Sequence, residues 1–147
     1  MKYLLFTLSI SVLLFAGCGH SSGHIKTEMV AGLVKLDGSP LSGATIMFHP
    51  LVGGEDASAF SKEDGTFVVT SQNGATGKGA VAGEYAVTVS KQEITFSVDP
   101  SAGPLSVPTA IYGPQLVPTV YHDKESTPLK VEIKRGRNTV LLELSSQ

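Results

Sequence analysis

The chain has 147 residues, a formal net charge of −2 and a single cysteine, and charged residues make up 16% of it. This length fits one domain, and one cysteine excludes both an internal disulfide and a cysteine-based zinc site. The slight negative charge gives no electrostatic basis for binding nucleic acid. A mean hydropathy of +0.16 with 16 glycines argues against a protein with several membrane spans.

The N-terminus has the pattern of a secretory signal peptide. Lys2 is followed by an apolar run from Tyr3 to Ala16, which ends at Gly17. A basic start, a short apolar segment and small residues at a cleavage site are typical of such peptides. The run is also shorter than the roughly 20 residues of a membrane-spanning helix. We therefore expect residues 1–17 to be a signal peptide and the protein to be exported.

Cys18 directly follows Phe15-Ala16-Gly17, and this sequence resembles the bacterial lipobox, where leucine is commonest at the position of Phe15. The resemblance implies that Cys18 becomes the mature N-terminus with a diacylglycerol thioether and an amide-linked acyl chain, which together give stable anchoring. Gly19 is compatible with export to the outer membrane under the enterobacterial sorting rule. We expect anchoring in the cell membrane or outer membrane, facing the periplasm or cell surface, with residues 18–27 as a flexible tether.

Residues 28–147 are predicted to form one β-sandwich domain. Apolar residues alternate at period two in short runs, which are separated by turn signals such as Asp37-Gly38 and Asp64-Gly65. Seven or eight short strands at this spacing predict an all-β, antiparallel Greek-key sandwich. The predicted strands are residues 30–36, 44–49, 57–61, 66–70, 83–90, 94–98, 129–134 and 139–144.

Residues 91–128 differ from the rest because six of the eight prolines lie there. Proline lacks a backbone N–H and fixes φ, so we expect a mostly extended loop with a short edge strand at 94–98. Apolar and aromatic groups occur among the prolines, as in Ile111-Tyr112-Gly113-Pro114. Two interpretations stay open: the loop folds over a sheet edge and protects it, or it binds a peptide or a glycan.

Three motifs follow one another along the predicted strands. They are G-x-V-x-L-D-G-x-P-L-x-G-A at 32–44, D-G-x-F at 64–67 and G-x-Y-x-V-x-V at 83–89. In this order they resemble the bacterial carboxypeptidase-regulatory-like domain, which has a transthyretin-like, or prealbumin-like, fold. The resemblance covers about residues 28–144, and it implies the fold and an envelope setting without an assigned activity.

The C-terminal part adds to this resemblance. Pro118-Thr119-Val120-Tyr121 and Ser126-Thr127-Pro128-Leu129 are similar to the tails of short planctomycete lipoproteins of this group. Hydroxyisourate hydrolase shares the transthyretin fold but ends in Tyr-Arg-Gly-Ser, whereas this chain ends in Leu144-Ser145-Ser146-Gln147. That hydrolase activity is therefore not expected.

No motif in the sequence predicts an enzyme. The chain has neither a Gly-x-Ser-x-Gly elbow nor a His-Glu-x-x-His helix. We interpret Gly77-Lys78-Gly79 as a flexible loop, and we expect no cofactor and no metal site. The four histidines are interpreted as tether or surface residues: His20, His24, His49 and His122.

The sequence therefore predicts a lipid-anchored cell-envelope β-sandwich module with a structural or protein-interaction role, no catalysis, and Cys18 as its lipidated residue. The alternative is a carbohydrate- or peptide-binding accessory domain at the cell surface. An exposed aromatic platform would favour this alternative, whereas the absence of tryptophan disfavours it. The expected partners are the membrane, through the anchor, and an unidentified envelope protein or glycan.

Overall fold

The computed structural model describes residues 26–71, 79–98, 101, 103 and 107–147. The predicted signal peptide and Cys18 lie outside these residues, as does most of the predicted tether. The elements are β1 (Met29–Leu36), β2 (Ser39–Pro40), β3 (Thr45–Pro50), β4 (Ala57–Phe60), β5 (Thr66–Val68), β6 (Thr70–Ser71), β7 (Gly83–Ser90), β8 (Gln92–Ser97), β9 (Thr109–Gln115), the 3-10 turn η1 (Thr119–Tyr121), β10 (Lys130–Ile133) and β11 (Arg137–Leu144).

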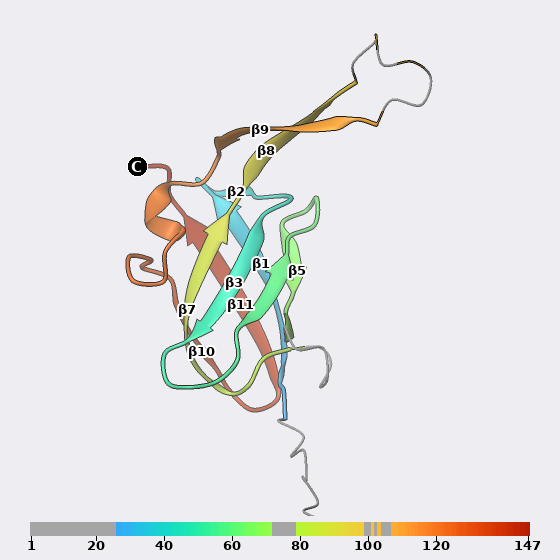
Figure 1. Cartoon of the computed structure of the whole chain (residues 1–147). Helices are drawn as coiled ribbons and strands as arrows, with labels where there is room; N and C mark the ends of the chain where they lie inside the picture. The colour runs from blue at the N-terminus through green and yellow to red at the C-terminus, as the bar shows by residue number, and fades with distance from the viewer. Residues whose placement is uncertain (1–25, 72–78, 99–100, 102, 104–106) are drawn as a thin grey trace, which may run out of the picture.

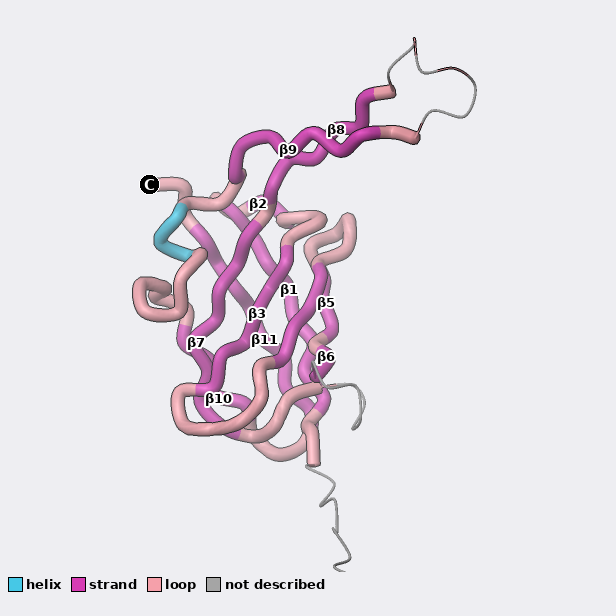
Figure 2. The backbone as a smooth tube through the Cα atoms, viewed as in Figure 1, coloured by secondary structure: helices cyan, strands magenta, loops and turns pink. Residues whose placement is uncertain are grey.

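Two sheets face each other and enclose the core. One sheet has the strand order β10-β7-β3-β4-β6, and the other has β11-β1-β2, with β5 also paired to β1. Figures 1 and 2 show β3 and β7 in front of β1 and β11. The predicted all-β sandwich is confirmed. Each of the eight predicted strands has a counterpart, the one predicted at 66–70 is divided into β5 and β6, and β2 and β9 are added in the described part of the chain.

The period-two pattern decides which side chains enter the core. In β11, Val140, Leu142 and Leu144 are buried, whereas Leu141 between them is 55% exposed. Alternation of this kind is expected where a strand has one face in the core and one in water. The largest fully buried side chains come from both sheets: Tyr85, Phe48, Phe67, Ile46, Ile133 and Leu142.

Three aromatic rings join the two sheets. The ring centroid of Phe48 in β3 lies 6.3 Å from that of Phe67 in β5, and 6.2 Å from that of Tyr85 in β7. These separations lie within the range of favourable aromatic pairs. The Tyr85 hydroxyl donates a hydrogen bond to the carbonyl oxygen of Val81 at 2.9 Å, as expected for a buried tyrosine. Burial raises the pKa of the Tyr85 phenol above its ordinary value.

One strand pairing differs from the antiparallel prediction. β1 and β11 run parallel, from Met29 opposite Arg137 to Leu36 opposite Leu144. The other strand pairs among the described residues are antiparallel. Parallel neighbours need a long connection, which the rest of the domain provides between its first and last strands. A period-two pattern looks the same in both orientations, so it could not reveal this pairing.

Residues 91–128 form two separate structures instead of one extended loop. The prediction of a loop is wrong at 109–115, where β9 pairs with β8, while the short strand predicted at 94–98 corresponds to β8. Pro114 lies in β9 near an irregularity in the ladder between Gln92 and Ile94. An edge strand beside such an irregularity tolerates a missing N–H.

The second half of this segment packs on the sandwich. Val117 and Tyr121 are buried, and the Tyr121 hydroxyl accepts a hydrogen bond from the Ser145 N–H at 3.0 Å. The buried Thr127 hydroxyl donates to the carbonyl oxygen of Val87 at 2.7 Å. The interpretation that the segment covers the sandwich therefore applies to this half.

Gly32 lies at the closest approach between β1 and its neighbours. A Cβ at this position would be 2.3 Å from the carbonyl oxygen of Val140 and 2.4 Å from Cζ of Phe67. Phe67 is directly opposite Gly32 in the β1–β5 ladder, so its ring occupies the space above the glycine. Glycine is therefore required here for steric reasons.

We predict that Gly32→Ala lowers the free energy of unfolding by about 1–3 kcal/mol, because the added methyl displaces the Phe67 ring or the β11 backbone. Urea unfolding followed by circular dichroism measures this change. Gly113→Ala is the matched control, since its added Cβ would meet Glu93 at 3.1 Å in the hairpin, away from the core. Equal stability of Gly32→Ala and the native chain would contradict the steric role.

Candidate functional site

The hairpin β8–β9 stands apart from the sandwich. In the described part of the chain, β8 and β9 pair only with each other and form a separate two-stranded sheet. Figure 1 shows this hairpin projecting from the end of the sandwich where β7 finishes. The described chain enters β1 at the opposite end of the body. The start of β1 and the hairpin therefore lie at opposite ends of the described sandwich (Figure 1).

The register of the hairpin places a mostly apolar set of residues on one face and a mixed set on the other. Ile94 is opposite Tyr112 and Phe96 is opposite Ala110, and directly opposed residues in an antiparallel pair share a face. The other face carries Thr95 opposite Ile111 and Ser97 opposite Thr109. We call the first set the apolar hairpin face: Ile94, Phe96, Ala110 and Tyr112.

The apolar hairpin face is open to solvent. Ile94 is 49% exposed, Phe96 69% and Tyr112 66%. Val98, which continues the alternation of β8, is 51% exposed. Single exposed apolar residues are common on protein surfaces, whereas several together on one face indicate an interaction site. A two-stranded hairpin is also only marginally stable in water without further packing.

The base of the hairpin is held by specific hydrogen bonds. The Leu116 N–H donates to the carbonyl oxygen of Lys91 at 2.8 Å, and Gln92 Nε2 donates to the carbonyl oxygen of Gly113 at 3.0 Å. Lys91 directly follows β7, so the hairpin continues from a central strand of the sandwich. These contacts close the base of the hairpin at the point where it leaves β7.

The hairpin has little charge. Among its described residues, 92–98 and 107–115, Glu93 is the one charged side chain. A surface that binds phosphate groups or anionic lipid needs lysine or arginine. The hairpin therefore suits an apolar partner better than an anionic one.

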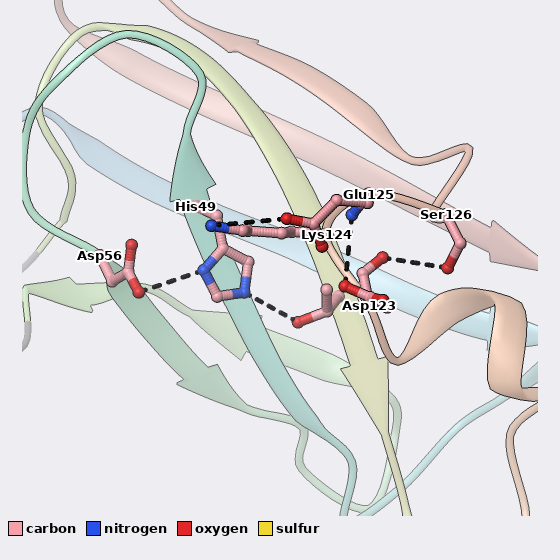
Figure 3. A network of polar contacts seen from close by, with 7 residues as sticks. His49, Asp56, Asp123, Lys124, Glu125 and Ser126 are labelled. Atoms are coloured by element: carbon pink, nitrogen blue, oxygen red, sulfur yellow. Dashed lines mark hydrogen bonds and ion pairs between the residues drawn. The ribbon is translucent and has the colours of Figure 1, made fainter.

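A second candidate site lies on the outer face of β3 and β7, around His49 (Figure 3). Its Nδ1 is 3.1 Å from Oδ2 of Asp56, and its Nε2 is 3.2 Å from Oγ1 of Thr88. A carboxylate only accepts hydrogen bonds, so Nδ1 carries the proton, and the Thr88 hydroxyl can donate to Nε2. Figure 3 shows the exposed ion pair of Lys124 and Glu125, 3.7 Å apart, beside this histidine.

The Asp56–His49–Thr88 series has the order of groups found in hydrolytic triads, but its surroundings do not suit catalysis. Thr88 is only 7% exposed. The adjacent pocket of about 260 Å³ is lined by other residues: His49, Pro50, Leu51, Ala86, Lys124 and Glu125. A nucleophile must reach its substrate, and Thr88 does not line this pocket. The network therefore holds β3, β7 and the residues before β4 together.

Sequence reasoning assigned His49 to the surface and missed this network. The three residues lie 7 and 39 positions apart along the chain. The pairing of β3 with β7, which places His49 opposite Ala86 and Met47 opposite Thr88, brings them together. The alternation of β3 placed His49 on the outer face, but it carried no signal for its partners.

We predict that His49→Ala lowers the free energy of unfolding by about 1–2 kcal/mol, because the buried Thr88 hydroxyl loses its partner. Asp56→Asn is the comparison, and it should cost less because the Asp56 side chain is 42% exposed. Urea unfolding of both variants provides the measurement. A His49→Ala protein as stable as the native one would show that the network contributes nothing to folding.

The other candidate residues are distributed as follows. His20 and His24 and residues 77–78 of the glycine-rich loop lie outside the described residues. His122 follows η1, and its buried Nε2 has no hydrogen-bond partner in the described structure. No group of three or more His, Cys, Asp or Glu side chains within the described ranges is arranged to hold a metal ion. Likewise, none of the helical residues described forms a segment long and apolar enough to cross a membrane.

Glu28 is a buried carboxylate that the sequence did not single out. Its Oε2 accepts a hydrogen bond from the Gly136 N–H at 2.7 Å, and its Oε1 is 3.4 Å from Nζ of Lys26. The Gly136 hydrogen bond is the main cause that lowers the pKa of Glu28 below its ordinary value of 4.5. This contact links the start of the domain to the turn between β10 and β11.

We predict that the native chain loses stability more steeply below pH 4.5 than Glu28→Gln does. Because the pKa of Glu28 is lowered on folding, its contribution is present above 4.5 and is lost as pH falls through the folded pKa. Urea unfolding at neutral pH and at successively lower pH tests this. Glu132→Gln, which removes an exposed carboxylate 3.4 Å from Lys134, serves as the control. Parallel pH profiles for the native chain and Glu28→Gln would refute the prediction.

The comparisons with known proteins identify no family. No protein-family model and no curated protein matches this chain. Among solved structures, the chain is similar to a 9R-lipoxygenase from Cyanothece PCC8801, with 14% sequence identity and a TM-score of 0.33. The match covers 79% of this chain but 16% of the lipoxygenase chain. Likeness at this level carries no argument about activity.

Proposed function

We propose that this protein is a lipid-anchored β-sandwich of the bacterial cell envelope that acts by contacting other proteins and catalyses no reaction. The observation that supports this proposal best is the β8–β9 hairpin. It presents an exposed apolar face at the end of the body opposite the N-terminal entry. A module anchored at one end would therefore hold this surface away from its membrane.

The sequence before the domain supplies the anchor in this proposal. Cys18 follows a lipobox-like sequence, and residues 18–27 connect it to β1. Ten residues of extended chain span at most about 35 Å. The sandwich would stay close to the membrane, with the hairpin directed outward.

The resemblance to carboxypeptidase-regulatory-like domains supports the fold and the envelope setting of this proposal. Its motifs fall on turns and core strands: Gly38 and Gly65 have φ of +81° and +77°, and Tyr85 is buried. Positive φ favours glycine at both turns. The motif residues therefore serve the fold, and the surface available for recognition lies elsewhere.

Binding of a carbohydrate or peptide is the second candidate function. Phe96 and Tyr112 are exposed on the same face of the hairpin, which is the aromatic surface that this alternative requires. However, the Tyr112 hydroxyl is the one polar side-chain group on the apolar hairpin face. Sugar recognition relies on several placed hydrogen-bonding groups beside the aromatic rings, so an apolar protein surface fits better.

We predict that Cys18→Ala moves the protein from the membrane fraction to the soluble fraction, because the change removes the thioether that carries the diacylglycerol. Cell fractionation with immunoblotting measures the distribution, and metabolic labelling with a fatty acid measures lipidation. Ser22→Ala, four residues along the tether, is the matched control and should stay in the membrane fraction. Unchanged membrane association of Cys18→Ala would overturn the anchor and the proposed function with it.

A further inference from the structure

We propose that residues 117–129, which we call the strap, open from the sandwich as one unit while both sheets stay folded. In the closed state the strap seals an edge of β7. In the open state the backbone groups of this edge are unpaired. The opening is a property of the sandwich itself, so it is independent of the proposed function and of the Cys18 anchor.

The closed strap takes the place of a strand at the edge of β7. β10 pairs with β7 from Gly83 to Ala86 and does not extend further along it. At the next residue, the Val87 N–H donates to the carbonyl oxygen of Leu129 at 2.9 Å, and the Val87 carbonyl oxygen accepts from the Thr127 hydroxyl at 2.7 Å. The end of the strap therefore satisfies both backbone groups of Val87. Unpaired groups at such an edge are a template for strand addition.

A second hydroxyl holds the middle of the strap. Tyr121, at the end of η1, is 7% exposed, and its hydroxyl accepts a hydrogen bond from the Ser145 N–H at 3.0 Å. Ser145 follows β11, so this contact joins the strap to the sheet that does not contain β7. The adjoining Ser146 N–H donates to Oδ1 of Asp37 at 3.0 Å, which fixes the chain beside Tyr121. The strap is thus bound to both sheets, through the hydroxyls of Tyr121 and Thr127.

The strap also has hydrogen bonds of its own, which make it a local unit. It contains the 3-10 turn η1. The Thr127 N–H donates to the carbonyl oxygen of Asp123 at 2.9 Å, and the Ser126 hydroxyl donates to that of Val120 at 3.0 Å. Both partners of each bond lie in the strap, so opening the strap does not break these bonds.

The strap is held to the body by few buried groups. Its buried residues are Val117, Tyr121 and Thr127, and its other residues are half-buried or exposed. In addition, Nε2 of His122 is buried without a hydrogen-bond partner in the described structure, which costs free energy in the closed state. Regions with few buried apolar contacts open more readily than the core to which they are attached. We therefore expect the strap to open at a lower free energy than the sandwich unfolds.

Native-state hydrogen exchange tests the proposal on the full chain, purified in detergent and followed by NMR at single amides. The Val87 amide reports the strap, because its acceptor is the Leu129 carbonyl oxygen. The Val34 and Val69 amides report the core, because they are hydrogen-bonded between β1 and the residues on either side of β5. We predict that Val87 exchanges at least about tenfold faster than these two, after correction for intrinsic rates, and that urea accelerates its exchange less.

A variant in the middle of the strap tests whether the strap opens as one unit. Tyr121→Phe should raise the exchange rate at Val87 about three- to tenfold, although the lost hydroxyl is bonded to Ser145 and not to Val87. Tyr112→Phe, which removes an exposed tyrosine hydroxyl from the hairpin, is the matched control. It should change the exchange rate at Val87 less than about twofold.

Gly32→Ala should give the opposite pattern, because it destabilises the core outside the strap. We expect faster exchange at Val34 and Val69, while Val87 stays within about twofold of its rate in the native chain. Equal acceleration at Val87 would overturn the proposal, and so would no effect of Tyr121→Phe at Val87. Equal rates and equal urea dependence of the three amides in the native chain would also overturn it, and this measurement needs no variant to fold.

Discussion

The packing of Phe48 between Phe67 and Tyr85 is the interaction on which the rest of the structure depends. It joins β3 and β7 of one sheet to β5 of the other. Phe67 reaches this position because Gly32 leaves room for its ring above β1. The ring contacts therefore depend on the missing side chain of Gly32. The same glycine is paired with Val140 in the parallel β1–β11 ladder, where a Cβ would also meet the Val140 carbonyl oxygen.

Beyond this core, the chain continues from the end of β7 into the hairpin β8–β9, which projects from the sandwich (Figure 1). The buried residues of both sheets form one cluster. The hairpin that follows β7 forms a separate two-stranded sheet, and its apolar face stays exposed among the described residues.

The polar network around His49 and the buried Glu28 have a different role. Each joins segments that are distant in sequence: Asp56 to β3 and β7, and Glu28 to the turn at Gly136. The His49 network lies beside the segment after η1, whose Thr127 is bonded to β7. These contacts hold the loops at the edges of the sandwich, where the apolar core does not reach, and none of them exposes a nucleophile to a pocket.

The sequence by itself determined the strands, their buried faces and the turns, because period-two alternation and Asp-Gly turns depend on neighbours a few residues apart. It also singled out Cys18 as a predicted lipidation site, because a lipobox-like pattern is a local signal. Only the tertiary structure decided the parallel partner of β1, the hydrogen bond between His49 and Thr88, and the hairpin at 92–115. The first two join strands far apart in the chain. The hairpin escaped detection because the prolines of residues 91–128 indicated a loop, while its strand pairing places Pro114 beside an irregular ladder. Its exposed apolar face has the alternation of a buried strand, and only the position of the body shows that nothing in the described chain covers it.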